Sequence, residues 1–491
     1  MHEINDLKEL IRSRVPIILI ESQEENRVLT ILEKLAPTIR QSLYGWSIID
    51  GFAQVMNAQI KSDSKLEPTE LLYHIFNMKM KGVFVLLDFH PYLTDDRNAR
   101  LLKQIAKESE KYQQTIILLS HHINVPDEIK HLTAHFELPL PDEQSLKNMI
   151  MEVGKKWITD NPGSRITTEK HMVDVLIQNL KGLTLPEARK LVWKALADGS
   201  LTKEDIPVIA EAKYKLLNKD GVLYYEQDTS SFQHVGGLKT LKQWLEQRKA
   251  IFLGQVERHG LDLPKGVLLL GVQGSGKSLA AKAIAGTWGV ALLRLDFGTL
   301  YNKYYGETER QTRDALKMAE MMAPCVLWID EIEKGVATDN SDGGTSKRVL
   351  GTLLTWMAER DSATFVVATA NDIQCLPPEL MRKGRLDEIF FVDLPDENIR
   401  KEIFRIHLDK RDLNSALFNF DELAEVSNGF SGAEIEQAIV SGLYSMIGES
   451  GKLTQAALVD EIRKTRPLSV IMAEQIDDMR RWAMDRTVSA N

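Results

Sequence analysis

The chain has 491 residues, of which 43% are hydrophobic and 27% are charged, and its formal net charge is −9 at pH 7. This length predicts roughly two to four domains, and the acidic balance disfavours a general affinity for nucleic-acid backbones. No apolar run is long enough to cross a membrane, and the first residues lack the charged-then-apolar layout of a signal peptide. The two cysteines, Cys325 and Cys375, have no C-x-x-C spacing, so we expect reduced thiols in a cytoplasmic protein without membrane association.

The first part of the chain has the pattern of an α/β module. Residues 15–21, 82–88 and 114–120 are apolar runs of strand length, and a helical pattern follows the first of them. Residues 22–27 stand where a phosphate-binding loop belongs, but they contain no glycine or lysine. We therefore expect a scaffold or partner-binding module that has lost its phosphate loop.

Polar side chains end the strands of this first module. Asp88 is followed by Phe89, so the second acid that would polarise a water molecule is missing. His90, His121 and His122 also lie at strand ends, but their spacing fits no ligand pattern on one helix face. We favour ordinary strand-end histidines here over a metal site.

The strongest chemical signal lies in the second half. An apolar strand over residues 266–270 leads into Gly-x-x-x-x-Gly-Lys-Ser over residues 271–278, and helix formers follow. This setting predicts a P-loop, in which backbone N–H groups surround phosphate oxygens, Lys277 reaches the β- and γ-phosphates and Ser278 offers its hydroxyl to Mg²⁺. We expect ATP and Mg²⁺ as ligands. The residues expected at the nucleotide are Gly271, Gln273, Gly274, Ser275, Gly276, Lys277, Ser278 and Leu279.

Two acids close the next apolar strand of this half. Residues 326–331 end in Asp330 and Glu331, which the P-loop upstream marks as a functional pair rather than as solvated strand-end acids. Asp330 is expected to hold Mg²⁺ through water, and Glu331 to orient and polarise the attacking water.

The order of strands, polar strand ends and helices in the first half recurs in the second. We infer two α/β nucleotide-fold modules in tandem, although any two doubly wound domains share some of this pattern. The expected divisions are a degenerate α/β module over residues 1–145, a lid-like helical part over 146–215, a linker over 216–233, an ATPase domain over 234–398, and a small helical lid with C-terminal helices over 399–491.

Four further motifs accompany the P-loop: Val-Gly-Gly-Leu at 235–238, Ile-Asp-Glu at 329–331, Ala-Asn at 370–371 and Gly-Arg-Leu-Asp at 384–387. Together they resemble the AAA ATPases over about residues 233–466. The whole chain is similar, more narrowly, to the "hypothetical chloroplast reading frame" AAA proteins of plastids and cyanobacteria. The resemblance implies a doubly wound parallel sheet with a small helical lid, preceded by a degenerate AAA-like module, in a bacterial cytosol or a plastid stroma.

The resemblance also assigns roles to single residues. Asn371 matches the AAA sensor that hydrogen-bonds the γ-phosphate or the lytic water. Arg385 matches the arginine that projects into the nucleotide site of the neighbouring subunit, where a guanidinium stabilises transition-state charge. Many relatives have a second arginine three residues later, whereas this chain has Glu388, which leaves Arg382 as a candidate helper.

Two further regions are assigned in the same way. Tyr304 and Tyr305 match the loop that lines the central channel of an AAA ring and grips an extended chain, although one of them can instead pack inward. Gly432 and Ala433 match backbone that lies close to the adenine and the ribose, and Gly237 of the Val-Gly-Gly-Leu motif is also expected at the nucleotide.

These observations favour a Mg²⁺-dependent ATPase that forms a homo-oligomer, a hexameric ring or spiral, and remodels a protein partner. The alternative is an ATP-switched regulatory binding protein with slow turnover, whose first module recruits the partner. A nucleic-acid motor is disfavoured by the acidity and by the lack of a basic and aromatic run. A fused metalloprotease is disfavoured because the chain has no His-Glu-x-x-His motif.

Overall fold

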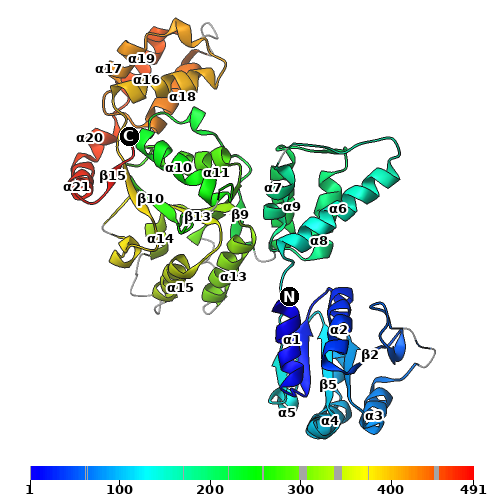
Figure 1. The fold of residues 1–491 in the computed structure, drawn as a ribbon. Coiled ribbons are helices and arrows are strands. Elements are labelled where there is room, and N and C mark those ends of the chain that lie inside the picture. Colours follow the sequence, from blue (N-terminus) through cyan, green and yellow to red (C-terminus); the bar gives the residue numbers. More distant parts are fainter. Residues whose placement is uncertain are drawn as a thin grey trace. The chain divides into compact units, whose positions relative to one another are not determined.

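The computed structural model describes residues 2–60, 62, 65–169, 171–218, 221–256, 259–297, 307–336, 345–373, 375–446 and 453–491 (Figure 1). It divides into two compact units, Met1–Pro141 and Asp142–Asn491. None of the helices in these stretches has the length and apolar character needed to cross a lipid bilayer.

The first unit is built on a sheet with the strand order β3-β2-β4-β5-β1-β6. Its strands are β1 (Ile17–Glu21), β2 (Ser42–Ser47), β3 (Gly51–Gln54), β4 (Gly82–Leu87), β5 (Gln114–Ser120) and β6 (Thr133–His135). All pairs are parallel except β2 with β3. Its helices are α1 (His2–Arg12), α2 (Glu25–Ile39), α3 (Pro68–Met78), η1 (His90–Thr94), α4 (Asp96–Tyr112) and α5 (Asp127–Lys130).

Alternation along the strands gives this sheet two buried faces. Ile18 and Ile20 of β1 pack with residues of α1 and α2, whereas Ile17 and Leu19 pack with residues of α3 and α4. Successive strand residues point to opposite faces, so a continuous apolar run is the pattern of a strand covered on both sides.

The second unit begins with a helical part. Its elements are α6 (Glu143–Asp160), β7 (Thr167–Thr168), α7 (Met172–Leu180), α8 (Leu185–Ala195), β8 (Ser200–Leu201) and α9 (Asp205–Leu217). Thr184 and Glu187 form a capping box at the start of α8, which satisfies N–H groups that the first helical turn leaves free.

The sheet of the second unit has the order β15-β14-β10-β13-β12-β11-β9 and is parallel except for β9 against β11. Its strands are β9 (Leu223–Tyr225), β10 (Gly266–Gly271), β11 (Ala291–Leu295), β12 (Cys325–Ile329), β13 (Thr364–Ala370), β14 (Glu388–Val392) and β15 (Val488–Ser489). The edge strand β9 lies within residues 216–233, which we expected to be only a linker. The strand was missed because its three residues, which pair with β11, are too few to show a periodicity in the sequence.

The helices around this sheet are η2 (Phe232–His234), α10 (Lys239–Phe252), α11 (Lys277–Trp288), α13 (Glu307–Met321), α14 (Ile332–Val336), α15 (Thr345–Glu359), η3 (Pro378–Met381), α20 (Leu468–Ile471) and α21 (Ala473–Ala483). The lid contains α16 (Glu397–Asp409), η4 (Ser415–Leu417), α17 (Phe420–Val426), α18 (Gly432–Met446) and α19 (Gln455–Lys464). Its core includes Phe404, Leu408, Ile435 and Ile439.

The two sheets share one topology. Numbered by chain order within each module, β6-β1-β5-β4-β2 and β14-β10-β13-β12-β11 are both 5-1-4-3-2. The prediction of two α/β modules in tandem is therefore confirmed. In each sheet the carboxyl ends of the parallel strands meet at one edge, where ligands bind in folds of this class.

Candidate nucleotide-binding and active site

The phosphate loop follows β10, which lies between β13 and β14 in the sheet. A Cβ atom on Gly271 would lie 2.0 Å from the carbonyl oxygen of Val392, so a side chain does not fit at this strand end. Gly274 and Gly276 have φ angles of 75° and 97°, a region that glycine adopts readily. Helix α11 then begins at Lys277, which directs its free N–H groups at the loop.

Lys277 is folded back onto the loop that it follows. Its Nζ donates hydrogen bonds of 2.8 Å to the carbonyl oxygens of Gly271 and Val272, and the residue is only 6% exposed. Burial lowers the pKa of Lys277 to about 8. The negative charges of nearby acids, Glu333 most of all, act in the opposite direction and raise it. Among the described residues the ammonium group therefore has no carboxylate partner, and it lies in reach of a phosphate entering the loop.

The two residues predicted as metal ligands lie together. Oδ1 of Asp330 accepts hydrogen bonds from Ser278 Oγ at 3.3 Å and from Thr369 Oγ1 at 2.6 Å. The contact with Thr369 follows from the parallel register of β12 and β13. A hydroxyl and a carboxylate are oxygen donors of the kind that Mg²⁺ prefers, so the donor set fits this ion.

Glu331 is held by three neighbours. Its backbone N–H donates to Thr369 Oγ1 at 3.0 Å, and its Oε1 accepts from the Asn371 side-chain amide at 3.0 Å. Its other carboxylate oxygen forms an ion pair with Lys334. The φ angle of Glu331 is 48°, an uncommon backbone conformation for a residue other than glycine and one often found at functional sites.

Glu333, on α14, belongs to this site and was not predicted. Its Oε1 accepts a 2.9 Å hydrogen bond from the Asn371 backbone N–H. Its Oε2 is buried without a hydrogen-bond partner among the described residues. Burial is the main cause of its raised pKa. The sequence signal that could have indicated Glu333 is its place as the third acid of Asp-Glu-Ile-Glu at 330–333.

A cleft of about 400 Å³ lies beside the phosphate loop. It is lined by all the predicted nucleotide residues from Gln273 to Leu279, by Asp330, Glu331, Thr369 and Asn371, and by Gly432 and Ala433 of the lid. The backbone N–H of Ala433 donates to the carbonyl oxygen of Gly274 at 3.2 Å, which joins lid and loop directly.

The lid supplies further residues to the cleft that the sequence analysis missed. Ile403, Ile406 and His407 come from α16, and Glu436 comes from α18. Nδ1 of His407 lies 3.4 Å from Oε1 of Glu436, and burial is the main cause of the lowered pKa of His407. An apolar wall next to polar ring and carboxylate groups suits a nucleoside.

Two of the predicted glycines lie elsewhere. Gly236, and not Gly237, lines the cleft, and the N–H of Gly237 donates to Oε2 of Glu402 at 3.0 Å. Gly271 does not line the cleft either, and its carbonyl oxygen holds Lys277.

Arg385 lies apart from this cleft. Asp387, two residues later, accepts hydrogen bonds from the backbone N–H groups of Lys265 and Gly266, at 2.7 and 3.0 Å, at the start of β10. The phosphate loop follows the other end of β10, roughly 16 Å away at the rise of a parallel strand. Arg385 donates to the carbonyl oxygen of Glu379 and does not line the cleft of its own chain. Tyr304 and Tyr305 lie outside the described residues.

A P-loop at a central parallel strand, two strand-end acids and a helical lid define a P-loop nucleotide-binding protein. The family model "ATPase family associated with various cellular activities (AAA)" matches residues 267–394. Models of the SpoVK-like AAA ATPase N-terminal domain and second domain match residues 3–138 and 143–220.

Similar proteins extend over the full chain. The AAA domain-containing protein ycf46 of Pyropia yezoensis is 36% identical over 99% of this chain and 98% of that protein. The ycf46 protein of Guillardia theta is 34% identical over 98% of this chain and 95% of that protein. A proteasome-activating nucleotidase of Saccharolobus islandicus is 34% identical over 49% of this chain and 63% of that protein. The chain therefore belongs to the AAA ATPase family, as the sequence motifs indicated.

Proposed function

We propose that this protein is a Mg²⁺-dependent ATPase that works as an oligomer and uses hydrolysis to remodel a protein partner. The observation that carries this proposal is the convergence of Lys277, Ser278, Asp330, Glu331 and Asn371 on one cleft. These side chains provide a phosphate-binding cation, oxygen ligands for a metal ion, and a carboxylate with an orienting amide. Phosphoryl transfer depends chiefly on such positioning and charge neutralisation.

Each group has a separate task in the proposed reaction. Lys277 exchanges the carbonyl oxygens of Gly271 and Val272 for phosphate oxygens. Ser278 and Asp330 hold Mg²⁺, which supplies charge neutralisation at the phosphates. Glu331 aligns a water molecule and accepts its proton as the water oxygen bonds to the γ-phosphorus and the bond from that phosphorus to the β–γ bridging oxygen breaks, which releases ADP and phosphate. Asn371 orients Glu331.

The position of Arg385 supports an oligomer. Because it lies at the opposite edge of the sheet from its own phosphate loop, it reaches only the nucleotide of a neighbouring copy. There the guanidinium stabilises charge that develops on the transferred phosphoryl group. One copy then lacks a complete active site, and a closed ring or spiral, with six copies as the expected number, completes each site.

A protein client is the proposed target. The name of the nucleotidase relative connects that protein with activation of a proteasome. The present chain is acidic, and it is better suited to act on a protein than on a nucleic acid.

One observation favours the alternative of a slow ATP-dependent switch. One oxygen of the Glu331 carboxylate, the group that must receive the attacking water, is engaged in the ion pair with Lys334. While this ion pair persists, ATP hydrolysis should be slow. The protein would then spend most of its cycle bound to ATP.

Complementation between variants tests the proposed function. Lys277→Ala removes ATP binding but leaves Arg385 intact, whereas Arg385→Ala removes the arginine and leaves the phosphate loop intact. Each variant alone is expected to be inactive, and mixing them should restore steady-state hydrolysis. Lys383→Ala is the matched control, since this neighbouring cation is exposed and has no assigned role in the site. Full activity of Arg385→Ala alone, or no recovery in a mixture that co-assembles, would contradict the shared site.

A further inference from the structure

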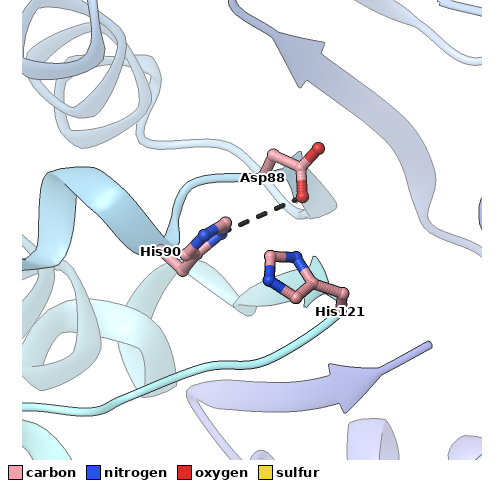
Figure 2. A group of neighbouring side chains, drawn as sticks. All are labelled: Asp88, His90 and His121. Atoms are coloured by element: carbon pink, nitrogen blue, oxygen red, sulfur yellow. Dashed lines mark ion pairs between the residues drawn. The ribbon is translucent and has the colours of Figure 1, made fainter. Parts of the chain in front are cut away.

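The first unit contains a second group of polar side chains at the carboxyl edge of its sheet. Asp88 directly follows β4, His121 follows the adjacent strand β5, and His90 begins η1 (Figure 2). One nitrogen of each imidazole and one carboxylate oxygen all lie within 4.8 Å of one another. These residues do not have the spacing of one helix face, but their side chains converge from the ends of two neighbouring strands.

Ser120, the last residue of β5, orients two members of this group. Its hydroxyl donates to Oδ1 of Asp88 at 2.8 Å and lies 2.7 Å from Nδ1 of His90. A serine hydroxyl has a single hydrogen. Since that hydrogen goes to Asp88, Nδ1 of His90 is the donor toward Ser120, and Nε2 of neutral His90 keeps its lone pair. This is the arrangement that fixes the tautomer of a metal-binding histidine.

The same corner of the second sheet is the predicted Mg²⁺ site. Asp88 and Asp330 each follow the third strand of their module in chain order, and Ser120 and Thr369 donate to the respective aspartates at 2.8 and 2.6 Å. Asp88 has a left-handed backbone, with φ 49°, whereas the left-handed residue at the second corner is Glu331, with φ 48°. The first module thus retains an aspartate and a strand-end hydroxyl at this corner of the fold, and it adds two imidazoles.

The surroundings of this corner are acidic. Burial is the main cause of the raised pKa of Glu25, and the negative charges of Asp88 and Asp50 raise it further. Glu21 lies at the end of β1, beside β5, and pairs with His122 at 3.2 Å. A cation at Asp88 would offset this repulsion between carboxylates.

We propose that Asp88, His90 and His121 bind a divalent transition-metal ion, with zinc as the best match. Two imidazoles and one carboxylate form a ligand set typical of zinc and of related ions that keep open coordination positions. Nitrogen ligands disfavour Mg²⁺ and Ca²⁺, which prefer oxygen. Asp88 and His121 are exposed, so water or a group from a partner completes the coordination.

Metal binding by the full chain tests this site. The measurements use a Cys375→Ser background, because this cysteine is exposed and thiols are zinc ligands, and excess Mg²⁺ to occupy oxygen-only sites. The EDTA-treated protein should bind about one Zn²⁺ per chain by elemental analysis after gel filtration. Co²⁺ in place of Zn²⁺ should give visible d–d absorption.

Variants separate this site from other histidines. His90→Ala and His121→Ala should remove the Co²⁺ absorption, and Ser120→Ala should weaken binding about 10- to 100-fold. His122→Ala is the matched control, because this neighbouring histidine pairs with Glu21 outside the group. Circular dichroism in EDTA verifies that each variant is folded. Unchanged binding in folded His90→Ala and His121→Ala, or an equal loss in His122→Ala, would overturn the proposal.

Discussion

The side-chain amide of Asn371 donates a 3.0 Å hydrogen bond to Oε1 of Glu331, while its backbone N–H donates to Glu333 at 2.9 Å. One residue at the end of β13 therefore holds two of the acids that follow β12. Adjacent parallel strands place these groups within reach of each other, and the contact sets the direction in which Glu331 faces the cleft.

The first prediction follows from that contact. Asn371→Ala should lower kcat for ATP hydrolysis by about 100-fold, the scale of a small misplacement of a catalytic group, and leave ATP affinity nearly unchanged. Glu331→Gln removes the group that Asn371 orients, so adding Asn371→Ala to Glu331→Gln should have little further effect. Steady-state kinetics measure kcat, and a nucleotide-binding titration measures the affinity for ATP. Additive losses in the double variant would show that Asn371 acts independently of Glu331.

The ion pair between Lys334 and Glu331 gives the second prediction. Removing Lys334 releases the Glu331 carboxylate, so Lys334→Ala should raise kcat. Because Lys334 is exposed and an exposed ion pair contributes little free energy, the expected rise is only roughly two- to fivefold. Lys347→Ala, an exposed lysine at the start of α15, is the control. A drop in kcat would show that Lys334 positions Glu331 for attack and would weaken the argument for a slow switch.

Lys277 gives a prediction about pH. Burial lowers its pKa to about 8 in the nucleotide-free protein, so it is mainly charged at pH 7 and loses its proton as the pH rises through 8. Bound phosphates favour the charged form, and ATP binding should therefore take up about one proton at pH 9 and much less at pH 7. The apparent affinity should fall by up to about tenfold per pH unit above pH 8. Calorimetry in buffers with different ionisation heats measures the uptake, and equal uptake at both pH values would contradict it.

Lys213 gives a stability prediction in the second unit. Its Nζ donates to the carbonyl oxygen of Lys181 at 2.6 Å, and burial lowers its pKa to about 7. Because the folded pKa lies below the unfolded value, the unfolded chain binds more protons between about pH 7 and 10, and this group adds stability as the pH rises. Lys213→Met should therefore stabilise the protein most near pH 7 and progressively less toward pH 10. Thermal unfolding of both proteins across this range measures the difference, and a constant offset would rule out the titration of Lys213.

Sequence alone predicted the elements whose chemistry is local in the chain. The glycines from 271 to 276 and Lys277 lie in one loop, and Asp330 with Glu331 ends one strand, so spacing alone indicated their use. Glu436 and His407 reach the cleft from two lid helices, and only the packing of the lid brings them there.

The short strands and the converging histidines could not be predicted from sequence periodicity, for a similar reason. β9 and β15 have only three and two residues, too few to show alternation, and they exist through pairing with β11 and β14. His90 and His121 are separated by 31 positions, a distance that only the adjacency of β4 and β5 closes.

The last prediction separates remodelling from switching and concerns Tyr304. If the protein grips an extended client in a central channel, Tyr304→Ala should retain ATP hydrolysis and lose processing of the client, because the aromatic ring supplies most of the contact area. Tyr444→Ala is the matched control, since this exposed tyrosine lies on α18, outside the predicted channel loop. The client is first captured with Glu331→Gln in ATP, which holds the bound state. Processing that continues normally in Tyr304→Ala, with hydrolysis intact, would favour an ATP-dependent switch whose binding surface lies elsewhere on the chain.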